Sequence, residues 1–238
     1  SYNDVLGPTT AAAGFKEANV YSGGKVEKGI GGGVCQVSSV LYSAVLSANL
    51  EVVKRYNHSL IVSYVPYGQD ATVASGEIDF RFKNNTNEPL KIVTAIDENY
   101  IYTSLYGKKP VPGLTVEIEN ITLEKNSPQL IVKESPDLPA GKVEVEQNGM
   151  VGYVVDTYKN IYINGEFQER QYVSRSRYKA LDRIEIHGTG GAQPAAAPVA
   201  ASPVSESPVP AESADSTSTS APSSSPTPND AQESPASE

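Results

Sequence analysis

Residues 31–42, Gly-Gly-Gly-Val-Cys-Gln-Val-Ser-Ser-Val-Leu-Tyr, decide the fold of the first part of this 238-residue chain. From Val34 to Ala48, apolar side chains recur at the spacing of an amphipathic helix. Asn49 tolerates the left-handed conformation that commonly ends a helix. The stretch therefore predicts one main helix that begins directly after a glycine-rich loop.

Extended structure is predicted after this helix. Residues 1–33 are rich in Gly, Ala and Asn and are typical of a loop with short extended or helical pieces. Beyond the helix, strand patterns cover 78–82, 90–96 and 100–106, with turns between them. We expect these three strands to form an antiparallel meander packed on the helix, which gives residues 1–107 an α+β fold.

A second domain is expected after a stiff linker. The linker, residues 108–113, contains two prolines, and residues 114–190 show strand patterns separated by Gly and Pro. Their aliphatic content is too thin for a thick core, so we expect an elongated all-β domain. Tyr153, Tyr162 and Tyr172 are candidates for stacking on sugar rings, or for simply covering a thin sheet.

Residues 191–238 differ sharply in composition from the rest. Within 193–238 lie nine of the 17 prolines, 12 Ser, 10 Ala and no aromatic residue. Small and helix-breaking side chains bury too little apolar surface to offset the ordering of the backbone, so we expect a disordered spacer. Six acidic and no basic residues fall in this tail, so the formal charge of −9 leaves −3 on the folded part.

Charge and hydropathy exclude several classes of function. The folded part lacks the basic footprint of a nucleic-acid-binding protein. No run of 18 apolar residues is present, so we expect no membrane contact in this fragment and place any export signal or anchor upstream of Ser1. With one cysteine and two histidines, neither a disulfide nor a structural zinc site is expected, and no cofactor is predicted.

Cys35 is the first candidate for chemistry. It lies in the first turn of the predicted helix, where unpaired amides and the helix dipole stabilise a thiolate. His58 and Asp70 follow in the order of nucleophile, base and orienting acid that papain-like and transglutaminase-like thiol enzymes use. The surrounding loop would supply amide donors to an oxyanion. These oxyanion and binding-loop candidates are Gly31, Gly32, Gly33 and Gln36.

Other interpretations of the same residues stay open. A cysteine at a helix start can be a small buried hydrophobe, and a histidine can simply pack. A phosphate cradle would need the Lys and Ser/Thr of a Walker-type loop, which are missing after Gly33. Asp79 competes with Asp70 for the third role, although strand alternation turns it toward solvent. Further pocket candidates are Ser38, Ser39, Tyr42 and Arg55, of which the first three share the Cys35 face of the helix and could also meet solvent.

A dense run of motifs closely resembles the VanW family over about residues 1–107. The motifs are Gly31–Ser38, Leu41-Tyr42, Arg55, His58-Ser59, Tyr64–Pro66, Gly68–Val73, Phe80 and Asn84-Asn85-Thr86. Asn49 stands where such sequences usually carry Gly, which fits the same left-handed cap. Residues 114–190 resemble a G5 domain in the order of their glycines after the segment 134–139. The candidate glycines are Gly141, Gly149, Gly152, Gly165 and Gly188.

The resemblance implies location more than mechanism. It implies an exported cell-envelope protein of a Gram-positive type of bacterium, associated by family name with vancomycin resistance and usually held by an upstream membrane segment. For the G5 domain it implies adhesion to cell-wall sugars, with other members binding zinc.

Two hypotheses for function follow. In the first, an extracellular, cell-wall-associated protein cleaves or transfers amide bonds of peptidoglycan stem peptides through Cys35, His58 and Asp70, while the second domain binds wall glycan. In the second, the protein is a non-catalytic wall-binding or adhesion module. Its glycine-rich pocket then holds a carboxylate or a peptide end, and Cys35 is structural.

Overall fold

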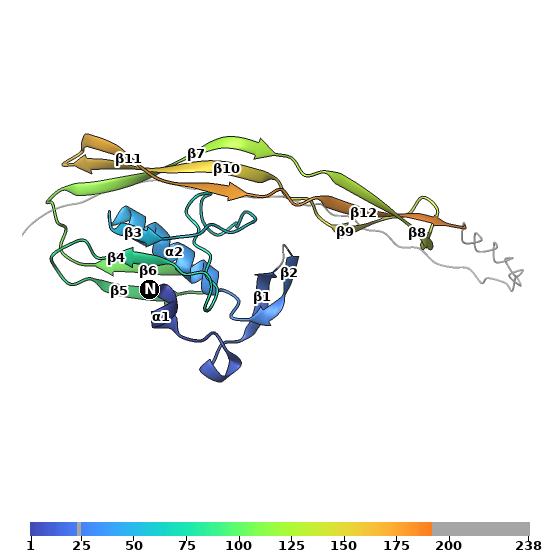
Figure 1. Ribbon diagram of the computed structural model, residues 1–238, viewed down its shortest axis with the longest axis horizontal. Coiled ribbons are helices and arrows are strands. Elements are labelled where there is room, and N and C mark those ends of the chain that lie inside the picture. Colours follow the sequence, from blue (N-terminus) through green and yellow to red (C-terminus); the bar gives the residue numbers. More distant parts are fainter. Residues whose placement is uncertain (23–24, 192–238) are drawn as a thin grey trace, which may run out of the picture. The chain divides into compact units, whose positions relative to one another are not determined.

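A computed structural model describes residues 1–22 and 25–191 of the chain (Figure 1). The predicted tail lies outside the described residues, except for its first residue, Gly191. In chain order the helices and strands are α1 (Tyr2–Leu6), the 3-10 helix η1 (Ala11–Ala13), β1 (Glu17–Ser22), β2 (Lys25–Ile30), α2 (Val34–Ser47), β3 (Glu51–Lys54), β4 (Arg81–Lys83), β5 (Lys91–Ile96), β6 (Ile101–Tyr106), β7 (Leu114–Asn126), β8 (Leu130–Pro139), β9 (Val143–Gln147), β10 (Gly152–Ile163), β11 (Glu166–Tyr178) and β12 (Arg183–Gly190).

The predicted main helix is confirmed as α2. Gly33 precedes it with a φ of 90°, and Asn49 follows it with a φ of 55°, which is the left-handed residue expected at its end. The buried face of α2 meets the segments around Ala71 and Phe80 to form the core of the first domain. The core residues are Leu41, Tyr42, Val45, Leu46, Leu50, Ala71, Val73 and Phe80.

The strands of the first domain are antiparallel, as predicted, but their pairing differs from the expected meander. β4 pairs with β3, the strand that directly follows α2, with Glu51 opposite Lys83. β5 and β6 form a separate two-stranded hairpin. The prediction of one three-stranded meander is therefore wrong. Residues 81–83 pair with β3, which precedes them in the chain, and not with β5, which follows them.

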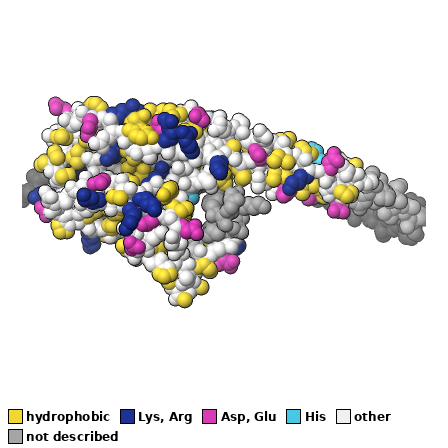
Figure 2. Space-filling view, in the orientation of Figure 1, with side chains coloured by type: hydrophobic (Ala, Val, Ile, Leu, Met, Phe, Trp, Pro, Cys, Tyr) yellow, Lys and Arg dark blue, Asp and Glu magenta, His cyan; other side chains and the backbone are white. Residues whose placement is uncertain are grey.

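The second domain is all-β, as predicted, and contains two three-stranded sheets. One has the order β11-β10-β7 and is fully antiparallel, while the other has the order β8-β12-β9, with β12 parallel to β8. At Gly188 the backbone of β12 passes so close to Pro139 that a side chain would collide with its carbonyl oxygen. Many apolar side chains of the second sheet stay exposed, among them Val132 and Val143 at 48% each, as a thin sheet requires (Figure 2).

The two domains pack together within one compact unit, Ser1–Gln193. Ile118 of β7 and Val173 of β11 pack on the core around α2. Lys159 of β10 donates from Nζ to the side-chain oxygen of Asn49 at 2.6 Å, and the amide of Lys179 donates to the carbonyl of Ser59 at 2.7 Å. The second domain therefore contacts both the end of α2 and the loop that carries His58. None of the helices in the described part of the chain has the length and apolar character needed to cross a membrane.

Candidate active site

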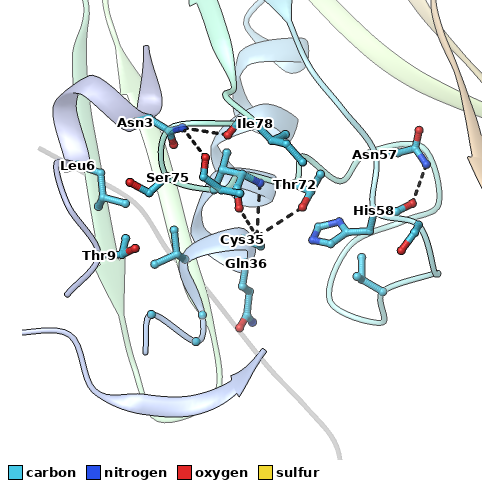
Figure 3. A pocket seen from close by; sticks show the side chains of 18 of the residues that line it. Asn3, Leu6, Thr9, Cys35, Gln36, Asn57, His58, Thr72, Ser75 and Ile78 are labelled. Atoms are coloured by element: carbon cyan, nitrogen blue, oxygen red, sulfur yellow. Dashed lines mark hydrogen bonds between the residues drawn. The ribbon is translucent and has the colours of Figure 1, made fainter. Parts of the chain in front are cut away.

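Cys35 lies in the first turn of α2 and lines a cavity of about 670 Å³ (Figure 3). Its Sγ contacts Thr72 Oγ1 at 3.7 Å, donates to the carbonyl of Val73 at 3.4 Å and accepts from the amide of Val73 at 3.5 Å. The segment after Asp70 therefore crosses the start of the helix and holds the thiol from one side. The cavity leaves the thiol open to a ligand from the other side.

His58 lies beside Cys35 and is oriented by Asp70. Its Nδ1 is 2.7 Å from Asp70 Oδ2, and its backbone amide donates to the same oxygen at 2.6 Å. Figure 3 shows the imidazole turned toward Cys35. Nε2 is 3.3 Å from the hydroxyl of Tyr64 and is the nitrogen that remains to exchange a proton with the thiol. The structure thus brings the three predicted residues together in the predicted order.

Asp70 is fully buried and is held from the side opposite His58. Arg55 donates from NH2 to Asp70 Oδ1 at 2.9 Å and from Nε to the Asp70 carbonyl at 2.6 Å. The hydroxyl of Tyr178, at the end of β11, also donates to Oδ1. Two donors therefore meet each carboxylate oxygen, which is the arrangement a buried carboxylate needs.

The pKa values of the three groups favour an ion pair between the thiol and the imidazole. Burial raises the pKa of the Cys35 thiol, but hydrogen bonding to His58 and Val73 and the charge of His58 outweigh it and lower that pKa. Burial lowers the pKa of His58, yet hydrogen bonds to Asp70 and Cys35 and the charges of both raise it to about 9. The shift of each pKa is thus in the direction that stabilises a thiolate beside an imidazolium.

The carboxyl of Asp70 supplies the negative charge behind this pair. Burial raises its pKa, but the hydrogen bond from His58, the charge of Arg55 and the hydrogen bond from Tyr178 lower it overall. Asp70 is therefore ionised where His58 carries its proton. This is the role of an orienting acid.

The glycine loop presents backbone amides at the same cavity. Gly31, Gly32, Gly33 and Gln36 all line it, but the amide of Gln36 already donates to the carbonyl of Gly33 at 3.0 Å. Among the described residues, the amides of Gly32, Gly33 and Cys35 have no backbone acceptor. These three amides and the Gln36 side chain belong to residues that line the same cavity as Cys35, so they are the candidate donors to a developing oxyanion.

The four pocket candidates are not among the described residues that line the cavity, and instead they pack or form hydrogen bonds behind the site. Ser38 and Ser39 are buried and donate to the carbonyls of Cys35 and Ala71. The guanidinium of Arg55 lies 5.0 Å from the ring centre of the buried Tyr42. The expectation that these side chains meet a ligand is therefore replaced by a role in holding the helix, the Asp70 segment and Asp70 itself.

Asp79, the competitor for the third role, lies elsewhere. It accepts from the hydroxyl of Ser1 at 2.8 Å and from the amide of Asn3 at 3.1 Å, so it anchors α1. Sequence reasoning missed Thr72 and Tyr178 as contacts of the site. Thr72 follows Asp70 closely, whereas Tyr178 is 108 residues away and no local pattern signals the contact.

The three candidate glycan-binding tyrosines do not share a face. Tyr153 packs on Tyr67 of the first domain, with ring centres 4.8 Å apart. Tyr172 is 56% exposed and packs edge-on against Tyr158, and Tyr162 packs against Phe167. Because alternate residues of β10 point to opposite faces, Tyr162 lies on the face away from Tyr153. A platform made of all three tyrosines is therefore excluded, and Tyr162 and Tyr172 remain.

Both domains are similar to known protein families. The family model described as VanW like protein matches residues 1–106, and that of the G5 domain matches residues 117–189. The uncharacterized protein YoaR of Bacillus subtilis is 49% identical over 92 residues, which cover 39% of this chain and 30% of YoaR. The vancomycin B-type resistance protein VanW of Enterococcus faecalis is 28% identical over 159 residues, which cover 63% of this chain and 54% of VanW.

The chain therefore spans about half or less of the length of these curated relatives. Among solved structures, a G5 domain of an IgA1 protease is 34% identical, with a TM-score of 0.25, and matches 32% of this chain and 90% of its own. The G5 domain of HP0197 is 21% identical, with a TM-score of 0.20, and matches 32% of this chain and 97% of its own. From the two family matches, residues 1–106 belong to the VanW-like family and residues 117–189 are a G5 domain.

Proposed function

We propose that the first domain is a thiol acyltransferase or amidase that acts on peptide stems of the cell wall, and that the G5 domain keeps it on wall glycan. One observation carries the proposal. Cys35, at the amino end of α2, and His58, oriented by the buried Asp70, meet at an open cavity. Nucleophile, base and orienting acid in this order are the parts that covalent acyl transfer needs.

The substrate class comes from the domain combination. VanW-like and G5 domains are associated with the cell envelope, and G5 domains bind cell-wall glycans, so the chain is a cell-envelope protein with a partner in the wall. The relative from Enterococcus faecalis is named for resistance to vancomycin. The stem peptides are the part of peptidoglycan that is joined by peptide bonds, and we take them as the substrate.

The proposed reaction has two steps, acylation of Cys35 and release of the acyl group. The Cys35 thiolate adds to an amide carbonyl, and the developing oxyanion accepts hydrogen bonds from the amides of Gly32, Gly33 and Cys35. The His58 imidazolium gives its Nε2 proton to the departing amine as the C–N bond breaks, which leaves a thioester on Cys35. A water or an acceptor amine then attacks the thioester, His58 takes the proton of that attacking group, and the thiolate leaves.

Mass spectrometry of the protein with purified muropeptides tests the proposal. Because Cys35 is the single cysteine of the chain, an acyl adduct on it is unambiguous. We expect peptide cleavage or exchange by the wild type, and its loss in Cys35→Ser with wall binding retained. Retained wall binding without any Cys35-dependent turnover across a panel of stem peptides would show a binding module with a structural thiol and contradict the proposal.

A further inference from the structure

We infer that Tyr178 of the second domain is a positioning residue for the thiol site of the first domain, because its hydroxyl fixes the Asp70 carboxylate against His58. The role in catalysis rests on the function proposed above, whereas the effect on the thiol does not. The site is then completed by β11 and is shared between the two domains.

The hydrogen bonds of Tyr178 show how it is placed. Its hydroxyl donates to Asp70 Oδ1 and accepts from the amide of Gly68 at 2.8 Å, and the whole residue is only 3% exposed. Within residues 1–22 and 25–191, Asp70 Oδ2 accepts hydrogen bonds from His58 alone, through Nδ1 and the backbone amide. Oδ1 is therefore the oxygen by which the rest of the protein sets the angle of the carboxylate to the imidazole.

β11 holds the loop of His58 at further points. Ser176 Oγ accepts from Arg55 NH1 at 2.8 Å, so the second partner of Asp70 Oδ1 is itself anchored to β11. The side chain of Asn57 donates to the carbonyl of Arg177 at 2.8 Å, and the carbonyl of Ser59 accepts from the amide of Lys179 at 2.7 Å. Both chain neighbours of His58 are thus bonded to residues at the end of β11.

The turn before Asp70 is fitted to the same sheet. Gly68 has a φ of 91°, and a Cβ at this position would collide with Oγ1 of Thr157 on β10. That hydroxyl instead donates to the Gly68 carbonyl at 3.3 Å. The second domain therefore makes two hydrogen bonds at this segment. One goes from Tyr178 to the carboxylate of Asp70, and the other goes from Thr157 to the backbone carbonyl of Gly68.

Loss of the Tyr178 hydroxyl has a defined consequence. The carboxylate would keep the bond from Arg55 and could rotate toward that charge, away from Nδ1 of His58. The imidazolium would be less well stabilised, and with it the thiolate that depends on its charge. Several ionisable or charged groups surround this cluster. They are Tyr2, Cys35, Tyr42, Arg55, His58, Tyr64, Asp70 and Tyr178.

The test compares Tyr178→Phe with Tyr153→Phe in the full 238-residue chain. Each variant loses one hydroxyl from neighbouring strands of the same sheet, but the Tyr153 hydroxyl has no hydrogen bond among the described residues. Alkylation of Cys35 by iodoacetamide is measured from pH 5 to 10, with thermal unfolding of the same samples. We expect Tyr178→Phe to raise the apparent pKa of Cys35 and to slow alkylation at pH 6.5 at least threefold, since each pKa unit is about tenfold in thiolate. Tyr153→Phe should match the wild type.

A folded Tyr178→Phe with the wild-type pH profile would overturn the inference, because a hydroxyl with a purely structural role changes stability without moving that profile. If Tyr178→Phe does not fold, Ser176→Ala takes its place. It removes the hydrogen bond that anchors Arg55 to β11, so we expect a smaller rise in the apparent pKa of Cys35. The alkylation profile is independent of turnover. If the wild type is inactive toward stem peptides but Tyr178→Phe shifts the alkylation profile, only the proposed function is contradicted. If the wild type is active and Tyr178→Phe leaves both the profile and the activity unchanged, only the role of Tyr178 is contradicted.

Discussion

Four hydrogen bonds converge on the carboxylate of Asp70, which is 0% exposed. In Asp70→Asn the buried guanidinium of Arg55 loses its counter-charge, and we expect the free energy of unfolding to fall by about 3–5 kcal/mol. Chemical denaturation measures the loss. The matched control is Glu146→Gln, which breaks the exposed pair with Lys133 at 2.8 Å and should cost at most about 1 kcal/mol. Equal losses in the two variants would contradict a buried ion pair at Asp70.

His58 makes stability depend on pH in a defined direction. Its pKa rises from 6.5 to about 9 on folding, so its contribution is complete below pH 6.5 and is lost as pH rises through 9. We expect the stability advantage of the wild type over His58→Gln to shrink between pH 6 and 10, by on the order of 3 kcal/mol. Urea unfolding at each pH measures it. A constant advantage across this range would be incompatible with a protonated His58.

The start of α2 depends on the backbone conformation of Gly33. Its φ is 90° and its surroundings are open, so in Gly33→Ala the cost is backbone strain, about 1–2 kcal/mol. Gly165, in the turn between β10 and β11, has a φ of 82° and is equally open, which makes Gly165→Ala the matched control. We expect similar losses of stability in thermal unfolding, but slower Cys35 alkylation in Gly33→Ala alone. Equal alkylation rates would mean that the loop does not set the position of the thiol.

The outer face of the β11-β10-β7 sheet carries the remaining candidates for sugar stacking, Tyr162 and Tyr172. Arg170 lies 3.7 Å above the ring of Tyr158, which packs against the exposed Tyr172. We expect Tyr172→Ala to reduce retention on purified peptidoglycan several-fold, because an exposed ring can cover the apolar face of a sugar. Tyr153→Ala, on the face that meets the first domain, is the control. Loss of retention in Tyr153→Ala but not in Tyr172→Ala would contradict sugar binding on the face that carries Tyr172.

The elements that could be predicted from the sequence are those whose signals lie close together in the chain. Glycines before Cys35 and helical spacing after it are contiguous, and they identified α2 and its thiol. Tyr172 and Tyr178 are six residues apart and would share a face of a regular strand, but a bulge intervenes. Thr157 pairs with Ser174 while Tyr158 pairs with Tyr172, so Val173 is the extra residue of β11. The bulge turns Tyr178 toward Asp70 and Tyr172 away from it, and alternation alone could not reveal it.

The whole described molecule is joined across its two domains by buried contacts. Val173 and Ile118 of the G5 domain pack on the core around α2, and Tyr178 reaches Asp70. We therefore expect differential scanning calorimetry to show one unfolding transition for both domains. Tyr178→Phe should move this transition to lower temperature without dividing it. Two separate transitions in the wild type would contradict a shared core.

The bulge at Val173 has a consequence for how such proteins are put together by recombination. The G5 domain matches a family model of its own, which is what a module open to exchange would show. Here an exchanged module would have to bring a hydroxyl at the place of Tyr178 and the same extra residue before it. A replacement strand without that residue would present its outer side chains to Asp70. The interface between the domains thus restricts modular exchange, because the replacement domain has to restore the hydrogen bond to the buried Asp70 as well as the G5 fold.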